Sequence, residues 1–205
     1  MRLRLAGRLC HAALVSDLEL AAHARPWFRA VYPVPTPLEL PVRPGEAGEE
    51  PPGEGPIVVH APSHAPTKGT PRIERALRAI ATRRPLRIRL VSGVPHAQVL
   101  AEVARADLVV DQLNSATPGV LALEAMALGV PVALEYDPAW LAPFAERVPL
   151  VRVTPDSLES EIERLLDDPR RREELAEAGP AYVRAVHDAE RVAAAVEHVY
   201  EHVAS

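Results

Sequence analysis

The sequence predicts an α/β fold with a doubly wound parallel sheet of the Rossmann type. Five short runs rich in β-branched residues or leucine alternate with four longer segments of helical period, and this alternation is typical of βαβ units. Because βαβ crossovers are right-handed, successive units place helices on both faces of a parallel sheet. At 205 residues, the chain has room for one such domain and a shorter additional segment.

The elements of the predicted sheet all follow residue 56. The five strands are Ile57–Ala61, Arg87–Val91, Leu108–Gln112, Val130–Glu135 and Leu150–Val153. The four helices between them are Pro71–Thr82, His96–Ala104, Val120–Leu128 and Pro138–Arg147. Three terminal helices are predicted at Asp156–Asp167, Arg170–Ala178 and Ala181–Val203. The second of these should end at Gly179-Pro180, because glycine often terminates a helix and proline cannot continue one. We therefore expect residues 57–205 to form one domain with extra C-terminal helices.

The first 56 residues divide into two parts. Residues 41–56 (PVRPGEAGEEPPGEGP) are rich in proline, glycine and glutamate and predict a flexible acidic linker. Before the linker, Ser16–Ala24 has helical character and Ala30–Val34 is expected to be extended. Residues 1–40 are too few for a domain of their own.

Composition excludes several classes of protein. Apolar residues make up 48% and charged residues 25% of the chain, the balance of a soluble globular protein. The net charge of −5 argues against an extended surface for nucleic acid. Cys10 is the single cysteine, so neither a disulfide nor a cysteine-based metal cluster is expected, and we expect no metal cofactor. With no apolar run of about 18 residues and no signal-peptide core, we expect a cytoplasmic protein without a membrane span.

The loop after the first predicted strand carries Lys68, the one lysine among 23 basic residues. Ligands of open α/β sheets bind at the carboxyl ends of the strands, where this loop lies. Gly69 and Thr70 follow Lys68 at the start of a helix, which places an ammonium group, a hydroxyl and backbone N–H groups against a phosphate. The spacing is not that of a Walker loop. The alternative interpretation is a surface lysine beside a glycine turn with a threonine cap.

The loop after the third predicted strand leads through Pro118 and Gly119 into a helix. Glycine allows a ligand to approach the backbone closely, and the N–H groups from Gly119 to Leu121 would face it, which suits a diphosphate. Glu124 lies in the second turn of this otherwise apolar helix, where a buried carboxylate needs a hydrogen-bond donor. The two hydroxyls of a ribose would be such donors.

The stretch Gly119–Val132 (GVLALEAMALGVPV) resembles the G-x-x-x-x-E-A-M-A-x-G-x-P-V signature of the family-4 (group 1) retaining glycosyltransferases of the GT-B fold. His60–Ser63 with Lys68–Thr70, and also Asp107–Gln112, are similar to flanking blocks of that family. The resemblance covers about Ile57–Ser205 and implies the C-terminal, donor-binding domain. Residues 1–40 then resemble a remnant of the N-terminal, acceptor-binding domain.

The resemblance implies roles for individual residues. Lys68, Gly69 and Thr70, together with Gly119, Val120 and Leu121, would bind the diphosphate of a nucleotide sugar, and Glu124 would bind its ribose. Two departures stand out. Many family members have a second glutamate eight positions before the first, and Ala116 stands there in this chain. The arginine that usually accompanies the lysine is replaced by residues such as Ser63 and His64, which we regard as possible donor-site residues.

The resemblance implies a glycosyltransferase that moves the sugar of a nucleoside diphosphate sugar, with retention, to an unidentified acceptor. No metal cofactor is implied, and a separate acceptor-binding domain or subunit would complete the enzyme. One alternative is a noncatalytic module or partner subunit that binds the nucleotide sugar without transfer. A further alternative is a domain of a nucleotide-sugar epimerase, which shares the two-domain architecture.

Overall fold

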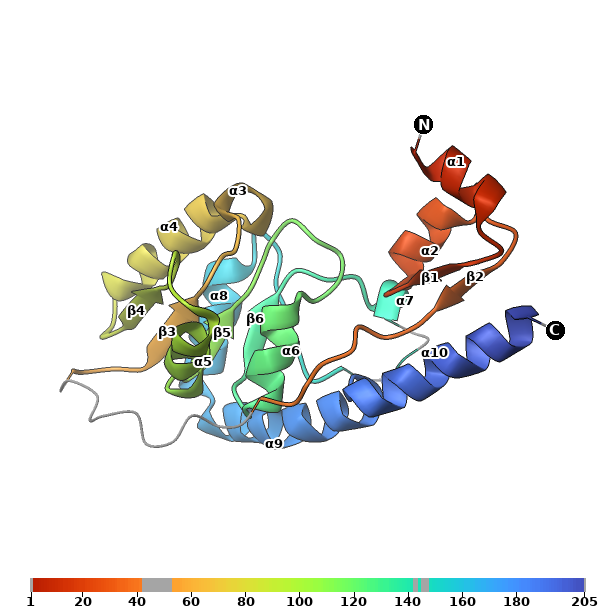
Figure 1. The fold of residues 1–205 in the computed structure, drawn as a ribbon. Helices are drawn as coiled ribbons and strands as arrows, with labels where there is room; N and C mark the ends of the chain where they lie inside the picture. The colour runs from red at the N-terminus through yellow and green to blue at the C-terminus, as the bar shows by residue number, and fades with distance from the viewer. Residues whose placement is uncertain (1, 42–52, 142–143, 145–147, 205) are drawn as a thin grey trace.

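The computed structural model describes residues 2–41, 53–141, 144 and 148–204, and it contains the predicted parallel sheet (Figure 1). The strands are β3 (Ile57–His60), β4 (Arg87–Leu90), β5 (Leu108–Val110), β6 (Val132–Leu134) and β7 (Val151–Arg152). Their order is β4-β3-β5-β6-β7, and every neighbouring pair is parallel. All residues of β3, β5 and β6 are buried, as expected where helices cover both faces of a parallel sheet. The predicted fold class is therefore confirmed.

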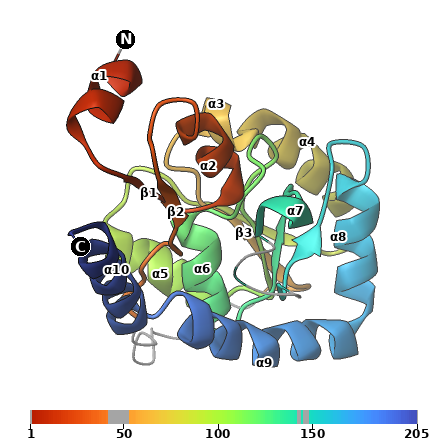
Figure 2. The same ribbon diagram turned by 90° about the vertical axis from the view of Figure 1, so that its right-hand side faces the viewer.

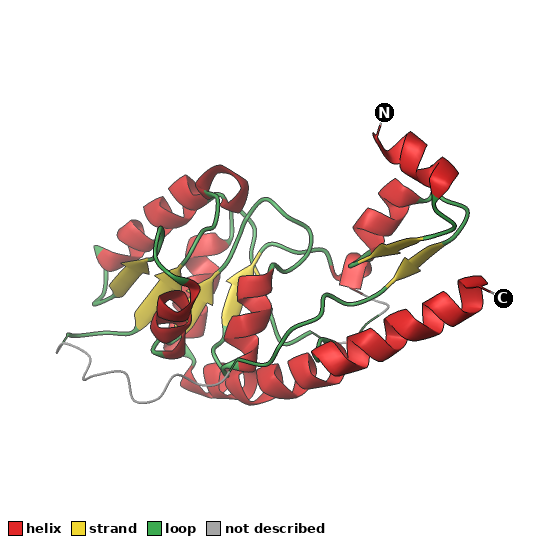
Figure 3. Ribbon diagram, viewed as in Figure 1, coloured by secondary structure: helices red, strands yellow, loops and turns green. Residues whose placement is uncertain are grey.

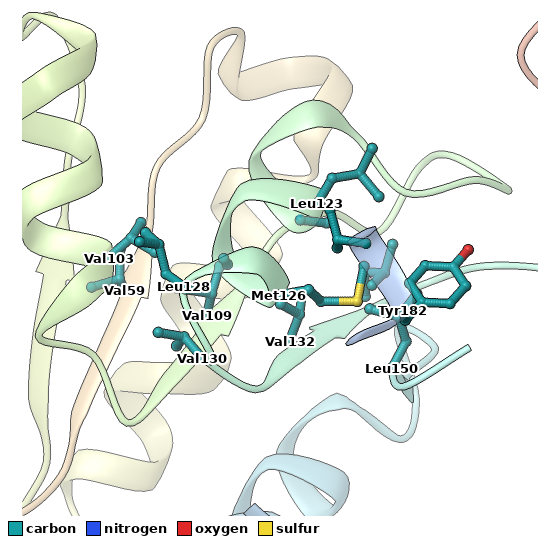
Figure 4. Close-up of a cluster of buried hydrophobic side chains, with 14 of the residues drawn as sticks. Val59, Val103, Val109, Leu123, Met126, Leu128, Val130, Val132, Leu150 and Tyr182 are labelled. Carbon is teal, nitrogen blue, oxygen red and sulfur yellow. The ribbon is translucent and has the colours of Figure 1, made fainter. Parts of the chain in front are cut away.

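Helices cover the sheet on both sides (Figure 2). The first side carries α5 (His96–Ala104) and α6 (Val120–Ala127), and the second carries α4 (Thr70–Ala81) and α8 (Leu158–Asp167). Alternate residues of the strands face the two sides. Val109 and Val132 pack with Met126 of α6 (Figure 4), whereas Val58 and Leu108 pack against α4 and α8. Period-2 alternation thus divides the apolar residues of β3, β5 and β6 between two cores.

The order of the strands creates a crevice at one place along the sheet. From β3 the chain crosses to β4 on one side, and it then returns to β5 on the other side of β3. The loops that leave β3 and β5 therefore diverge, and ligands of open α/β sheets bind at such a switch point.

The prediction that a helix ends at Gly179-Pro180 is wrong, because α9 (Pro169–Val186) runs through both residues. A Cβ atom at Gly179 would lie 2.6 Å from the carbonyl oxygen of Met126, so this glycine lets α9 approach α6 closely. Proline removes one helical hydrogen bond, and the contact between the two helices offsets that loss. The final helix, α10 (Ala189–Ala204), accordingly begins eight residues later than expected.

Two further helices differ from the prediction. A short helix, α3 (Ala65–Lys68), lies within the predicted loop after β3. The predicted helix Pro138–Arg147 is described as α7 (Pro138–Leu141), and residues 142–143 and 145–147 lie outside the described residues. Residues 42–52 of the predicted linker also lie outside them.

The N-terminal residues form a small βαβ unit that stands apart from the large sheet (Figures 1 and 3). We call this the N-terminal unit, and its elements are α1 (Arg2–Leu9), β1 (Ala13–Val15), α2 (Leu18–Ala24) and β2 (Val31–Pro33). Strands β1 and β2 pair in parallel. The side chain of Asp17 caps α2 by accepting a hydrogen bond from the backbone N–H of Leu20 at 2.8 Å.

The segment that leaves the N-terminal unit binds the junction between α9 and α10. His187 at this junction donates a hydrogen bond from Nδ1 to the carbonyl of Thr36 at 2.9 Å. Leu38 donates to the carbonyl of His187 at 2.7 Å, and Ala189 donates to the carbonyl of Leu38 at 3.2 Å. Burial lowers the pKa of His187, and this effect exceeds the opposing effect of the bond to Thr36.

Candidate functional site

The predicted lysine and glycine loops meet at the switch point of the sheet. Lys68 is the last residue of α3, which follows β3, and Gly119 immediately precedes α6, which follows β5. Leu113 donates a backbone hydrogen bond to the carbonyl of Lys68 at 3.3 Å, and Asn114 donates from Nδ2 to the carbonyl of Pro66 at 3.1 Å. The two loops are therefore joined to each other as well as to the sheet.

Two polar side chains at the end of β5 hold the ammonium group of Lys68. Its Nζ donates to Asp111 Oδ1 and to Gln112 Oε1, both at 2.7 Å. The side chain of Asp111 is fully buried and that of Lys68 is 14% exposed. The amide of Gln112 is oriented by a second bond, since its Nε2 donates to the carbonyl of Thr117 at 2.5 Å. Lys68 is thus a fixed positive charge on a side chain that is not completely buried.

The start of α6 lies directly beside this charge. The backbone N–H of Gly119 donates to Asp111 Oδ2 at 3.3 Å, and no acidic residue lies in the first turn. Among the described residues, the N–H groups of Val120 and Leu121 have no hydrogen-bond acceptor, as is usual for the first turn of a helix. A lysine beside free amides at the start of a helix is an arrangement that binds phosphate groups in proteins.

Gly69 and Thr70, which follow Lys68, are both buried. Gly69 has a φ of 71° and joins α3 to α4, a backbone conformation that favours glycine. The hydroxyl of Thr70 lies 2.9 Å from Nε2 of the buried His60. His60 Nδ1 must donate to the carbonyl of Val110, 2.8 Å away, because a carbonyl only accepts. Thr70 therefore donates to Nε2, and its proton is used within the protein.

Burial of His60 favours the neutral ring that this arrangement needs. Burial lowers its pKa from 6.5, and this effect exceeds the opposing effect of the backbone bond to Val110. His60 stands at the carboxyl end of β3 and contacts both the neighbouring strand β5 and the first residue of α4. It therefore anchors the helix that follows Lys68.

Glu124 lies on α6 with its side chain only 9% exposed. Its Oε1 accepts a hydrogen bond from Nε2 of His96 at 2.7 Å, and His96 is the first residue of α5. The sequence predicts that this carboxylate needs a donor, and the structure supplies one from a neighbouring helix. Glu124 lies one turn further along the helix than the free amides of Val120 and Leu121.

Ser63 and His64 lie on the exposed rim of the site. His64 precedes α3 and its Nδ1 lies 3.3 Å from the hydroxyl of Thr67. The carbonyl of His64 accepts a hydrogen bond from the backbone N–H of Lys68 at 3.2 Å. Among the described residues, neither Ser63 nor the side chain of His64 forms a hydrogen bond to the side chain of Lys68, to Gly119 or to Glu124. The structure therefore places them near the site without bringing them into its centre.

A polar pocket of about 380 Å³ opens beside Ala116 on the same edge of the sheet. Asp137 donates a backbone hydrogen bond to the carbonyl of Ala116 at 3.0 Å, which joins the loops after β5 and β6. The pocket is lined by Glu19, Asn114, Ser115, Ala116, Glu135, Tyr136, Asp137 and Arg152. Glu19 comes from α2, so the N-terminal unit contributes to this pocket. Its carboxylates and donors suit a ligand with several hydroxyl groups.

The described part of the chain contains no group of three or more histidine, cysteine, aspartate or glutamate residues arranged to hold a metal ion. Within the same residues, no helix is both long and apolar enough to cross a membrane.

The sequence predictions assigned no role to four residues that shape the site: His60, His96, Asp111 and Gln112. Asp111 and Gln112 lie at the carboxyl end of a buried strand, where ligands of open α/β sheets bind. Their position in the sequence could therefore have identified them as site residues. His60 could have been identified in the same way, because it is the last residue of the buried strand β3. His96 opens the helix after the second predicted strand, but nothing in the sequence links it to Glu124, which lies 28 residues away.

Solved structures with a similar fold include three glycosyltransferase-related proteins. The sucrose-phosphate synthase of Thermosynechococcus elongatus superposes with a TM-score of 0.75 at 20% identity over 98% of this chain. Anabaena HepE, solved in complex with UDP and glucose, gives 0.75 at 16% identity over 98% of the chain. The GtfA/B complex gives 0.68 at 14% identity, again over 98%. At these identities the similarity establishes the fold.

The chain is shorter than these neighbours. It spans 61% of the sucrose-phosphate synthase chain, 65% of the HepE chain and 47% of the GtfA/B chain. A comparison with curated protein sequences found no match.

The family is established by the sequence. The profile described as glycosyl transferase-like matches residues 64–198 of the 205, a range that includes Lys68, Gly119 and Glu124. The resemblance expected from the Gly119–Val132 block is confirmed. The chain is therefore a member of the glycosyl transferase-like family.

Proposed function

We propose that this chain binds a nucleoside diphosphate sugar at the switch point and takes part in transferring the sugar, with retention, to an acceptor held by a further domain or subunit. The observation that carries the proposal is the fixed ammonium group of Lys68 beside the free amides at the start of α6. The pair offers positive charge and oriented N–H donors within one small site.

The chemistry of transfer explains why these groups suit the reaction. The bond between the anomeric carbon and the phosphate oxygen breaks, and its electron pair stays on the departing diphosphate. Lys68 and the amides of Val120 and Leu121 would stabilise that growing negative charge. Because these groups are already in place, no metal ion is required in this proposal.

The ribose and the sugar of the donor would bind on either side of the diphosphate. Glu124 would accept hydrogen bonds from the ribose hydroxyls, since its carboxylate remains partly exposed. The sugar would enter the pocket beside Ala116, where Glu135, Asp137 and Arg152 stand near the position of the missing family glutamate. UDP is the first nucleotide to test, because HepE has been solved with UDP and with UDP-glucose.

Calorimetric titration with UDP, GDP and their glucose, N-acetylglucosamine and mannose conjugates tests the proposal. We expect at least one diphosphate to bind and its sugar conjugate to bind at least as tightly. A donor-hydrolysis assay that follows release of free diphosphate then reports the chemical step. Absence of binding by every nucleotide at millimolar concentration would contradict the proposed function.

A second candidate is a binding module or partner subunit that performs no transfer by itself. The N-terminal unit favours it, because a two-stranded sheet is marginal alone and its apolar surface is unusually open. Its exposed large apolar residues are Leu3, Leu5, Leu9, Leu14, Leu20 and Trp27. Such a surface is typical of an interface. Binding without hydrolysis or transfer would favour this candidate.

A further inference from the structure

Glu124 depends on a neighbouring helix for its hydrogen bond. Helix α6 is otherwise apolar over its length, VLALEAMA, so it offers the carboxylate no donor side chain. In the part of the chain that the structure describes, His96 alone supplies one, with its Nε2 at 2.7 Å from Oε1. Because a carboxylate only accepts, Nε2 carries a proton in this contact. Among the described residues, Oε2 accepts no hydrogen bond.

His96 is an unusual partner for a buried carboxylate because it is itself largely exposed. Its side chain is 66% accessible to solvent, so little apolar packing holds the ring in place. It follows Pro95 at the start of α5, and a Cβ at the nearby Gly93 would meet no atom within 4 Å. Among the described residues, the contact with Glu124 is the one hydrogen bond or ion pair that fixes the ring.

We propose that His96 is a positioning residue that holds the carboxylate of Glu124 in the orientation needed to bind a nucleotide ribose. This role rests on the proposed function. With Oε1 bound to His96, the plane of the carboxylate is fixed and Oε2 is left for a ribose hydroxyl. A carboxylate held in advance loses less conformational freedom on binding. His96 therefore contributes to ribose recognition without contacting the diphosphate.

The ratio of the affinities for a ribonucleotide and for its 2′-deoxy form tests this role, because a merely structural role for His96 would not change that ratio. Calorimetry would compare UDP, GDP and ADP with their 2′-deoxy counterparts on the full chain. For the wild type we expect the ribonucleotide that binds to do so about tenfold more tightly than its 2′-deoxy form, the size of one hydrogen bond to a charged group. In His96→Ala this ratio should fall below about threefold, while the affinity for the 2′-deoxy nucleotide stays within about twofold.

Three further variants make the test specific. His96→Gln retains a side-chain N–H donor and should restore most of the ratio. Glu124→Gln should lose the ratio, and adding His96→Ala to it should change the ratio no further, because the histidine acts through the glutamate. Gln98→Ala changes an exposed residue on the same helix and should behave as the wild type.

The outcomes separate this role from the proposed function. If the wild type binds and prefers the ribonucleotide, and His96→Ala keeps the full preference, the role of His96 is overturned while the function stands. Equal weakening of both nucleotides, accompanied by a lower melting temperature, would show that His96 is structural and would also overturn it. If the wild type binds none of the nucleotides, the proposed function itself fails and this role fails with it.

Discussion

The ammonium nitrogen of Lys68 lies close to Gly119, on the side where a side chain at position 119 would project. A Cβ atom built on Gly119 would stand 2.8 Å from Lys68 Nζ and 3.2 Å from Asp111 Oδ2. These separations are too short, so Gly119→Ala must displace the lysine or the start of α6. We expect this variant to bind UDP or the preferred nucleotide about tenfold more weakly by calorimetry, a loss of about 1.4 kcal/mol.

The control for this prediction is Val120→Ala. Val120 has an exposed side chain, and the substitution keeps the backbone N–H that faces the site. It should bind nucleotide as the wild type does. Equal affinities for Gly119→Ala and the wild type would show that the close approach has no role in binding.

Removal of the Lys68 side chain should affect both binding and stability. Loss of a charge-assisted hydrogen bond predicts weaker nucleotide-sugar binding by about 2 kcal/mol, roughly thirtyfold. Lys68→Ala also leaves the buried carboxylate of Asp111 without its cation, so the urea midpoint should fall. Arg78→Ala removes a largely exposed charge on α4 and should change neither quantity appreciably. An unchanged affinity in Lys68→Ala would remove the basis of the site.

Substitutions of Thr70 distinguish a hydroxyl that stabilises the fold from one that binds the ligand. Thr70→Val keeps the shape of the side chain but removes the donor to His60 Nε2. A buried acceptor without its partner costs about 1–3 kcal/mol, so the free energy of unfolding in urea should fall by that amount. Thr70→Ser should retain most of it. If Thr70→Val instead keeps its stability and loses nucleotide affinity, the hydroxyl binds the ligand as the family resemblance implies.

The tautomer and titration of His60 can be observed directly. Burial lowers its pKa below the ordinary 6.5 of the unfolded chain, so the unfolded state takes up a proton first as the pH falls. The stability that His60 contributes is therefore complete above pH 6.5 and is lost as the pH falls through its lower folded value. Long-range ¹H–¹⁵N NMR should show a proton on Nδ1 and none on Nε2 at pH 7. A midpoint at or above 6.5 for this ring would contradict the prediction.

Gly179 should tolerate no side chain. A Cβ would lie 2.6 Å from the carbonyl oxygen of Met126, and backbone atoms on both helices leave little room for adjustment. We expect Gly179→Ala to lower the free energy of unfolding by about 1–3 kcal/mol, the usual cost of overpacking. Glu177→Ala, an exposed change on the same helix, is the matched control. A gain in stability in Gly179→Ala would indicate that helix propensity outweighs the close contact.

Local sequence patterns predicted the sheet well because they reflect burial. The continuous apolar runs in β3 and β5 are typical of strands covered on both faces, and the helix expected at His96–Ala104 has the same bounds in the structure. The failure at Gly179-Pro180 has a tertiary cause. These residues usually end a helix, but here the glycine fits the backbone of α6 and the helix continues.

The sequence predicted those residues of the site that belong to short local motifs. The sequence indicated Lys68, Gly119 and Glu124, and the structure brings the first two into contact distance. It could not indicate the contact between His96 and Glu124, because that contact depends on how α5 and α6 pack against each other. Nor could it show that the hydroxyl of Thr70 is already used by His60, a residue ten positions earlier.

Hydrogen bonds at the junction between α9 and α10 join the segment that follows the N-terminal unit to the C-terminal helices. Residues 36 to 38 are bound to His187 and Ala189, and His187 ends the same helix whose Gly179 rests on the carbonyl of Met126 in α6. An unbroken series of contacts thus joins the exit of the N-terminal unit to the helix that carries Glu124. The position of the N-terminal unit is therefore tied through α9 to α6, the helix that begins at the site.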